Sequence, residues 1–399
     1  MHPTAEISTA AHNSPGTDPA SMPSRVPAVL QVVPALMTGG VERGTVEIAA
    51  ALARAGWRSL VASAGGPMVR EIERAGAEHI TLPLDSKNPL VIRRNIARLA
   101  RLIETRNIDL VHARSRAPAW SAFYAARRTG RRFVTTFHNI YGGETRLKRA
   151  YNAIMARGER VIAISDFVGA HARSVYHVTP SQLRVIPRGV DLGRFDPESV
   201  SQSRVIRLAG EWRLQDGVPV IMLPGRLTRW KGHLDLVEAA SRMPHRDFQV
   251  LFVGSDEAKP RFRSELVRRI QQHRLEGVFH IVGECRDMPA ALMLADVVVS
   301  ASAEPEGFGR VIVEAQAMGR PVVATDHGGA RETVLPGETG WLVPPGNRAA
   351  LADALTEALA LDAGQRAYMA AQARYWIAEH YDSRLMCEAT LAVYDELLF

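Results

Sequence analysis

Residues 296–332 read DVVVSASAEPEGFGRVIVEAQAMGRPVVATDHGGARE. The stretch combines a buried-strand pattern, a loop with two acids, an apolar helix, a second buried strand and a glycine turn. Glu306 falls in the loop, and Glu314 falls about one turn into the helix that Gly309 opens. Free N–H groups at a helix N-terminus attract anions, and a nearby carboxylate can bind hydroxyls of the group that carries a phosphate. The stretch therefore predicts a nucleotide-sugar site.

Strand and helix patterns alternate on both sides of a polar, irregular stretch at residues 193–215. Such alternation predicts parallel sheets covered on both faces. We therefore predict an α/β protein with two Rossmann-like, doubly wound domains whose strand ends face a cleft. The predicted parts are a disordered tail (1–25), an N-terminal acceptor domain (26–204), a C-terminal donor domain (205–376) and a terminal helix (377–399).

Composition supports a two-domain protein of the cytoplasm. A chain of 399 residues is too long for one ordinary core. Its two cysteines, Cys285 and Cys387, cannot form a disulfide scaffold, which fits a reducing compartment. Residues 1–25 lack the basic start and apolar core of a secretory signal. No apolar run approaches the length of a membrane span.

Positive charge is concentrated in the N-terminal half. Residues 1–204 hold 28 Lys and Arg against 16 Asp and Glu, whereas residues 205–399 hold 21 against 26. Docking on an anionic membrane, a phosphorylated acceptor and nucleic acid each explain a basic face, and so does simple solvation. The excess gathers at Arg127, Arg128, Arg131, Arg132, Arg146, Lys148, Arg149 and Arg157.

Several residues at predicted strand ends could bind a diphosphate. Arg226 and Lys231 follow a buried strand in LPGRLTRWKGH, where a guanidinium and an ammonium suit a diphosphate leaving group. Gly39 and Gly40 lie in a turn that permits close backbone approach. His138 ends another strand. Each motif also has an ordinary explanation. The two cations could be solvated, the glycines could form a structural turn, and the histidine could be structural.

The two acids of the first stretch allow a hydrolase reading as well. Glu306 and Glu314 could act as proton donor and nucleophile of a glycosidase, or could simply cap a helix. Their spacing across a loop and a helix does not define the distance between their carboxyl groups. The chain contains no Asp-x-Asp motif and no His, Cys and Asp cluster at metal-ligand spacing. We therefore predict chemistry without a metal ion and without a cofactor.

Together these motifs resemble the retaining family 4 glycosyltransferases with the GT-B fold. A finer likeness to bacterial lipopolysaccharide-core enzymes comes from SKNPL (86–90), HARSRAPAW (112–120) and YNAIMARG (151–158). The broader match is carried by GGVERG (39–44), TTFHN (135–139), VIAIS (161–165), VIPRGVD (185–191), GRLTRWKGH (225–233) and EPEGFGRVIVEAQAMGRPVVATDHGGARE (304–332).

The resemblance implies roles for residues of the C-terminal domain. Arg226 and Lys231 match the family's donor-diphosphate ligands. Glu314 matches the acid that binds the donor ribose. Glu306 matches the first acid of the motif, near the transferred sugar, and acts with the backbone amides of two neighbours, Phe308 and Gly309.

The resemblance also implies roles for the N-terminal domain. Gly39 and Gly40 match the loop that approaches the diphosphate, and His138 matches a residue that contacts the transferred sugar. Arg188 departs from the Asn-Gly form that is commoner at this turn. The family's last helix crosses back onto the N-terminal domain, so residues 377–399 are expected to do so.

The leading hypothesis is a retaining hexosyltransferase that moves a sugar from a nucleotide sugar to a cell-envelope acceptor. The family's retention is ascribed to front-face attack, with the leaving phosphate oxygen taking the acceptor's proton. A lipid-linked or lipopolysaccharide-type acceptor and an anionic membrane surface are the expected partners, at the inner face of the cytoplasmic membrane. A nucleotide-sugar 2-epimerase and a glycosidase are enzyme alternatives. A nucleic-acid-binding protein is disfavoured, because no basic segment is interleaved with aromatic residues.

Overall fold

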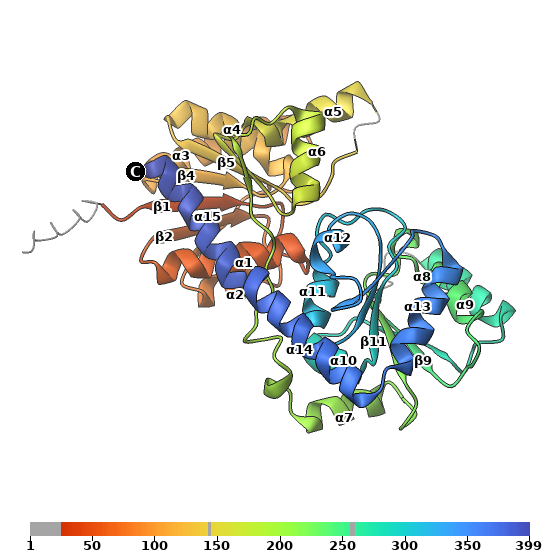
Figure 1. Cartoon of the computed structure of the whole chain (residues 1–399). Coiled ribbons are helices and arrows are strands. Elements are labelled where there is room, and N and C mark those ends of the chain that lie inside the picture. Colours follow the sequence, from red (N-terminus) through yellow and green to blue (C-terminus); the bar gives the residue numbers. More distant parts are fainter. Residues whose placement is uncertain (1–24, 143–144, 256–259) are drawn as a thin grey trace, which may run out of the picture.

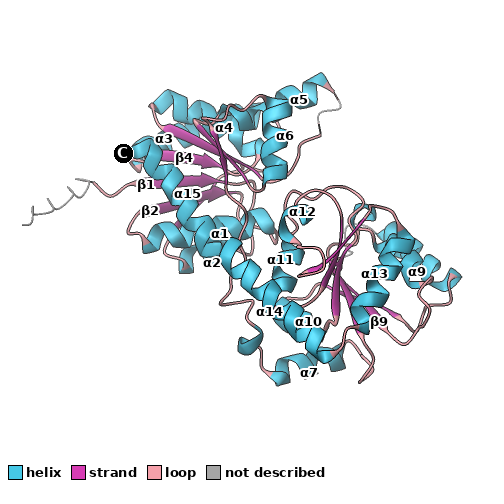
Figure 2. Cartoon of the chain, in the orientation of Figure 1, coloured by secondary structure: helices cyan, strands magenta, loops and turns pink. Residues whose placement is uncertain are grey.

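The chain forms two parallel α/β domains joined at two crossings (Figures 1 and 2). The structure is a computed structural model that describes residues 25–142, 145–255 and 260–399. The predicted tail therefore lies outside the described residues, apart from Arg25. Both sheets follow the doubly wound order, which confirms the predicted fold class.

The N-terminal sheet has the strand order β3-β2-β1-β4-β5-β6-β7. Its strands are β1 (Ala28–Val32), β2 (Arg58–Ser63), β3 (Glu78–Thr81), β4 (Leu110–Ala113), β5 (Arg132–Phe137), β6 (Arg160–Ala163) and β7 (Leu183–Val185). Its helices are α1 (Gly40–Arg54), α2 (Val69–Arg74), α3 (Pro89–Thr105), α4 (Arg116–Thr129), α5 (Arg146–Asn152), η1 (Ala153–Arg157) and α6 (Asp166–Tyr176).

Side chains of β1 alternate between the two faces of this sheet because successive residues of a strand point to opposite sides. Leu30 belongs to the core that is formed with α3 and α4, whereas Val29 belongs to a core formed with α1 and the last helix of the chain. All five residues of β1 are buried. The N-terminal sheet therefore needs a helix from the far end of the sequence to cover one face.

The C-terminal sheet has the strand order β10-β9-β8-β11-β12-β13. Its strands are β8 (Val220–Pro224), β9 (Gln249–Val253), β10 (Phe279–Gly283), β11 (Val297–Ser300), β12 (Val322–Thr325) and β13 (Gly340–Val343). Its helices are α8 (His233–Ala240), α9 (Pro260–Gln272), α10 (Met288–Leu294), α11 (Arg310–Ala317), α12 (Ala330–Thr333) and α13 (Arg348–Ala360), with a 3-10 turn η3 (Arg229–Lys231) before α8.

The polar stretch between the sheets is partly helical. It contains the 3-10 turn η2 (Pro197–Ser199) and α7 (Gln202–Glu211), which packs on α10. The predicted division after residue 204 falls inside α7. An ion pair of 2.6 Å between Arg204 and Asp287 holds this helix on the C-terminal domain.

Two terminal helices connect the domains a second time. Helix α14 (Ala363–His380) packs on α11, and α15 (Ser383–Leu398) packs on α1 of the N-terminal domain (Figure 1). The Asp382 side chain caps α15 by accepting a hydrogen bond from the N–H of Arg384. Among the helices of the described residues, none has the length and apolar character that crossing a membrane requires.

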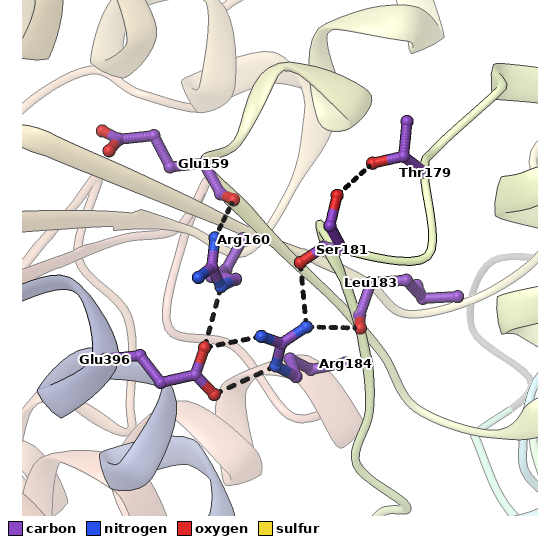
Figure 3. Close-up of polar contacts among 7 residues, drawn as sticks. All are labelled: Glu159, Arg160, Thr179, Ser181, Leu183, Arg184 and Glu396. Carbon is purple, nitrogen blue, oxygen red and sulfur yellow. Dashed lines mark hydrogen bonds and ion pairs between the residues drawn. The ribbon is translucent and has the colours of Figure 1, made fainter.

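Polar contacts hold α15 on the N-terminal sheet. Glu396 accepts hydrogen bonds from Arg184 at 2.7 Å and from Arg160 at 2.8 Å (Figure 3). The Tyr394 hydroxyl lies 2.7 Å from Nδ1 of buried His112. Both contacts join the last turns of α15 to strands of the sheet.

Candidate functional site

A glycine allows α8 to begin directly against the end of β11. Gly232 has φ +77°, which disfavours any residue with a side chain, and a Cβ there would overlap the carbonyl oxygen of Ala301. The preceding turn η3 carries Lys231 to the end of the sheet. The sequence WKGH thus places one cation beside the loop that follows β11.

Lys231 forms an ion pair with the first acid of the motif. Its Nζ lies 2.8 Å from Oε1 of Glu306, and the two side chains are only 15% and 20% exposed. The Ser302 hydroxyl donates to the same carboxylate oxygen. Arg226, by contrast, is exposed, and its side chain has no partner among the described residues. The structure therefore brings Lys231 and Glu306 together and leaves Arg226 available.

The loop that contains Glu306 ends at the N-terminus of α11. Gly309 occupies the position before α11 with φ +86°, and no side chain caps the first N–H groups of the helix. The loop packs on the glycine turn that follows β12, where a Cβ on Gly328 would overlap the carbonyl oxygen of Glu306. The N–H of Gly329 donates to that same oxygen at 2.9 Å. An uncapped helix N-terminus of this kind can receive an anion.

Glu314 lies on α11 and is already paired. Its Oε1 lies 2.7 Å from Nη2 of Arg310, one turn earlier, and its side chain is 13% exposed. A sugar hydroxyl would thus bind a carboxylate whose position the arginine restricts. The spacing of four residues on one helix could have revealed this partner from the sequence.

His138 follows β5 on the N-terminal side of the domain interface. Its Nδ1 lies 2.8 Å from Nη2 of Arg188, and its Nε2 is buried with no partner among the described residues. Burial lowers the pKa of His138 well below its usual value, and the nearby cations Arg188 and Arg114 lower it further. The imidazole is therefore neutral near pH 7.

The glycine pair lies at the start of α1, between cations of both domains. Arg188 donates to the carbonyl oxygen of Gly40. A Cβ on Gly40 would lie 3.0 Å from Nη1 of Arg188 and 3.3 Å from Cδ of Arg310. Gly39 has φ 173°, which any residue adopts. The close approach thus depends on Gly40, whose neighbours are Arg188 and Arg310.

The loop of Glu306 lies directly against the end of β5. The Ser165 hydroxyl donates to the carbonyl oxygen of Gly307 at 2.6 Å, and a Cβ on Gly307 would lie 2.9 Å from the carbonyl oxygen of His138. The loop that carries Glu306 therefore meets the end of β5, where His138 lies, at the domain interface.

Comparison with known proteins identifies the family. Residues 38–194 match the model described as Glycosyltransferase Family 4, and residues 207–376 match Glycosyl transferases group 1. A glycosyltransferase of Rickettsia africae shares 39% identity and superposes with a TM-score of 0.87, over 94% of this chain and 99% of that one. The chain belongs to the family 4 glycosyltransferases.

A sequence relative and a solved structure are also similar to this glycosyltransferase. A GDP-mannose-dependent phosphatidylinositol monomannoside mannosyltransferase of Mycolicibacterium smegmatis is 32% identical over 303 residues, which are 72% of this chain and 76% of the relative. Anabaena HepE, solved in complex with UDP-glucose, is 23% identical with a TM-score of 0.79, over 93% of this chain and 100% of that one. At that identity, HepE supports the fold alone.

The glycosyltransferase also has interface residues that the sequence patterns did not single out. Both oxygens of Glu332 accept hydrogen bonds across the interface, from the N–H groups of Asp166 at 2.9 Å and Phe167 at 2.8 Å. These two N–H groups open α6 and have no partner within their helix. Glu332 ends the stretch 296–332, but no local pattern predicts a partner in the other domain.

The described part of the glycosyltransferase has no group of side chains suited to hold a metal ion. Within residues 25–142, 145–255 and 260–399, no three His, Cys, Asp or Glu side chains gather where they could hold a metal ion. The charged groups beside the α11 N-terminus are instead Lys231, Glu306 and the Arg310–Glu314 pair.

Proposed function

We propose that this glycosyltransferase moves a sugar, with retention of configuration, from a nucleotide-diphosphate sugar to a lipid-linked acceptor of the cell envelope. The proposal rests on one observation. Lys231 is held by Glu306 in a loop that ends at the uncapped N-terminus of α11 and lies against the end of β5. That arrangement provides a cation and free N–H groups for a diphosphate beside a neutral histidine.

Each predicted residue has a physical role in this proposal. Lys231 and Arg226 stabilise the negative charge that grows on the leaving phosphate as its bond to the anomeric carbon breaks. Glu306 holds Lys231 in position, and Glu314 binds ribose hydroxyls beside Arg310. His138 contacts the transferred sugar through Nε2.

The remaining predicted contacts involve backbone groups. The N–H groups of Phe308 and Gly309 lie in the loop that leads into α11, where they can face a phosphate or the sugar. At the start of α1, Gly40, which Gly39 precedes, approaches the same ligand from the N-terminal domain. The mycobacterial relative, which is named as GDP-mannose-dependent, supports a nucleotide-sugar donor.

Retention follows in this proposal from attack on the same face that the leaving group departs from. The acceptor hydroxyl forms the new bond to the anomeric carbon while the bond to the phosphate oxygen breaks, and that oxygen takes the acceptor's proton. No protein base is needed. Because Lys231, Arg226 and the α11 N-terminus supply the positive potential, we also propose that neither a divalent cation nor a cofactor is required. Turnover that survives EDTA supports this, and turnover that EDTA abolishes and Mg²⁺ restores overturns it.

The acceptor proposal rests on the N-terminal surface and on one relative. Arg127 and Arg128 lie exposed in the last turn of α4, and Leu147 of α5 is 85% exposed. Arg131 and Arg132, in contrast, pair with Asp109 and Glu159. The mycobacterial relative is named for a phosphatidylinositol mannoside acceptor, which is a lipid. We propose that the N-terminal domain docks on an anionic membrane from the cytoplasm through exposed cations such as Arg127 and Arg128, and that the acceptor is of lipopolysaccharide-core type.

Charge reversal tests the membrane part separately. Arg127→Glu with Arg128→Glu is expected to reduce binding to vesicles that contain an anionic lipid, because each cation near such a surface contributes about 1 kcal/mol. Arg207→Glu with Arg246→Glu changes exposed arginines of the C-terminal domain and serves as the control. Equal loss in both variants, or no loss in either, contradicts docking through this surface.

The donor is tested by thermal-shift screening against UDP-, GDP- and ADP-sugars. A ligand that binds only the folded state at 100 times its Kd adds about 2.7 kcal/mol to the free energy of unfolding. NMR of the product then shows whether the anomeric configuration is retained. An epimerised nucleotide sugar or a free sugar as the main product would instead identify the 2-epimerase or glycosidase reaction.

Lys231→Met tests the role of the cation that Glu306 holds. Loss of one group that stabilises transition-state charge lowers kcat by about 100-fold or more. Arg229→Met is the matched control, because Arg229 lies in the same turn, is 69% exposed and pairs with Glu265. Wild-type kcat in Lys231→Met refutes the assigned site.

A further inference from the structure

We propose that Arg188 is a positioning residue that holds His138 in the tautomer with its proton on Nε2, so that Nε2–H donates to an oxygen of the ligand. The identity of that ligand as a nucleotide sugar rests on the function proposed above. The tautomer itself is a property of the ligand-free protein and can be measured without any substrate.

The direction of one hydrogen bond determines the tautomer. Arginine has five N–H donors and no acceptor, and it keeps its proton in proteins. Nη2 of Arg188 lies 2.8 Å from Nδ1 of His138, so Nδ1 must accept with its lone pair. A neutral imidazole with an accepting Nδ1 carries its single proton on Nε2. Nε2 is buried and has no partner among the described residues, so this N–H is left unpaired in the ligand-free protein.

The surroundings of His138 disfavour a second proton. Burial is the main cause of its lowered pKa, followed by the cations Arg188 and Arg114. The carbonyl oxygen of His138 faces Gly307 of the C-terminal domain. The carbonyl oxygen of Gly307 accepts a hydrogen bond from the Ser165 hydroxyl and not from the imidazole ring. His138 is therefore a neutral donor.

Arg188 is itself held rigidly. It is 6% exposed, and its Nη1 donates to the carbonyl oxygen of Gly40. The next residue, Gly189, has no room for a side chain, because a Cβ there would overlap the backbone of Ser383. Val190 then pairs with Tyr381 through a backbone hydrogen bond of 2.8 Å. The guanidinium therefore has one orientation toward the ring.

Keeping a cation at this position is unfavourable in itself. Burial lowers the pKa of Arg188 to about 9, and the neighbouring Arg310 and Arg114 contribute, while Glu47 and Glu42 act in the opposite direction. An amide or an apolar side chain would avoid that desolvation. Either of those would lose the property that distinguishes arginine here, which is that it can only donate to Nδ1.

The test is the ¹⁵N NMR spectrum of the His138 ring in full-length, ligand-free protein, assigned by its loss in His138→Gln. Between about pH 5 and 8, where histidines ordinarily titrate, wild type is expected to show an unprotonated Nδ1 and a protonated Nε2. Arg188→Lys keeps a side chain that only donates and should retain this pattern. Arg188→Met should show protonation of Nδ1, either as the other tautomer or by titration in this range. Arg320→Met removes another largely buried arginine and should leave the pattern unchanged.

A protonated Nδ1 in wild type overturns the proposal, and so does a wild-type pattern in Arg188→Met. If Arg188→Met does not fold, the wild-type spectrum still decides the tautomer, and Arg188→Lys decides whether a donor-only side chain suffices. In turnover, Arg188→Met should lower kcat/KM and add an ionisation to its pH profile, whereas Arg188→Lys should recover most of both. A confirmed tautomer without turnover of any nucleotide sugar refutes the proposed function and leaves the role of Arg188 intact.

Discussion

Glu332→Ala is expected to loosen the contact between the two domains. The carboxylate belongs to the C-terminal domain and accepts two hydrogen bonds from the first N–H groups of α6 in the N-terminal domain. A helix N-terminus carries a partial positive charge, so an anionic cap is favourable there. When the domains separate, water replaces the Glu332 carboxylate at these N–H groups. Glu332→Ala should therefore destabilise the contact between the domains more than it destabilises either domain.

The size of the effect follows from opposing contributions. A hydrogen bond to a charged group contributes about 1.5–3 kcal/mol, and Glu332 makes two. Burial raises the pKa of Glu332 despite these bonds, so desolvation of the carboxylate opposes their gain. Replacing a capping side chain by alanine costs about 0.5–2 kcal/mol. We expect about 2 kcal/mol, which is roughly a 30-fold change in the ratio of closed to open molecules at about 1.4 kcal/mol per factor of ten.

Single-molecule FRET between dyes on α3 and α9 measures that ratio directly. Glu332→Gln keeps one uncharged acceptor and should give an intermediate ratio. Glu338→Ala is the matched control, because Glu338 is exposed and its side chain has no partner among the described residues. If Glu332→Ala and Glu338→Ala give the same distribution as wild type, the cap does not hold the domains together and the reasoning is wrong.

Three further variants test the framework by chemical unfolding. Gly232→Ala should cost about 2–3 kcal/mol, because its Cβ would overlap the carbonyl oxygen of Ala301; Gly210→Ala, in open space, should not destabilise. Tyr394→Phe should cost about 1–3 kcal/mol, since it leaves a buried imidazole nitrogen unpaired. Glu396→Gln is the third variant. Arg184 and Arg160 lower the pKa of Glu396 to about 2. The contribution of Glu396 to the free energy of unfolding is therefore present above the unfolded value of 4.5 and is lost as pH falls through about 2. The 36% exposed side chain limits that contribution to about 1 kcal/mol, and the difference between Glu396→Gln and wild type should therefore vanish in acid.

The fold could be predicted because its signals are local. Buried strands alternate with amphipathic helices, and glycines stand where helices begin against strand ends, as Gly232 and Gly309 do. Strand β7 ends at Val185, which is the first residue of the VIPRGVD motif (185–191). Pro187, which has no N–H for a strand ladder, follows it, and residues 186–189 belong to no strand.

The partners within the site could be predicted only where they are close in sequence. Arg310 and Glu314 share one helix face, so their pairing was readable. The contact of His138 with Arg188 joins residues 50 apart, and the bonds of Glu332 to α6 join residues about 166 apart in different domains. Periodicity carries no information on such distances, because it describes which way a side chain faces and not which element it meets.

The Arg188–His138 pair should persist when the domains separate, because the hydrogen-bond partners of Arg188, Gly40 and His138, both belong to the N-terminal domain. Arg310, in contrast, is carried by α11 and approaches Gly40 only when the domains are together. Closure thus brings two like charges close, and the pKa of Arg188 is lowered partly for that reason. An anion bound between them removes this repulsion, so a ligand with phosphate groups should favour closure.

In the same FRET assay, inorganic diphosphate is expected to increase the closed fraction of wild type and to have a smaller effect on Arg310→Met. An equal increase in both proteins would show that the repulsion between Arg310 and Arg188 does not control closure.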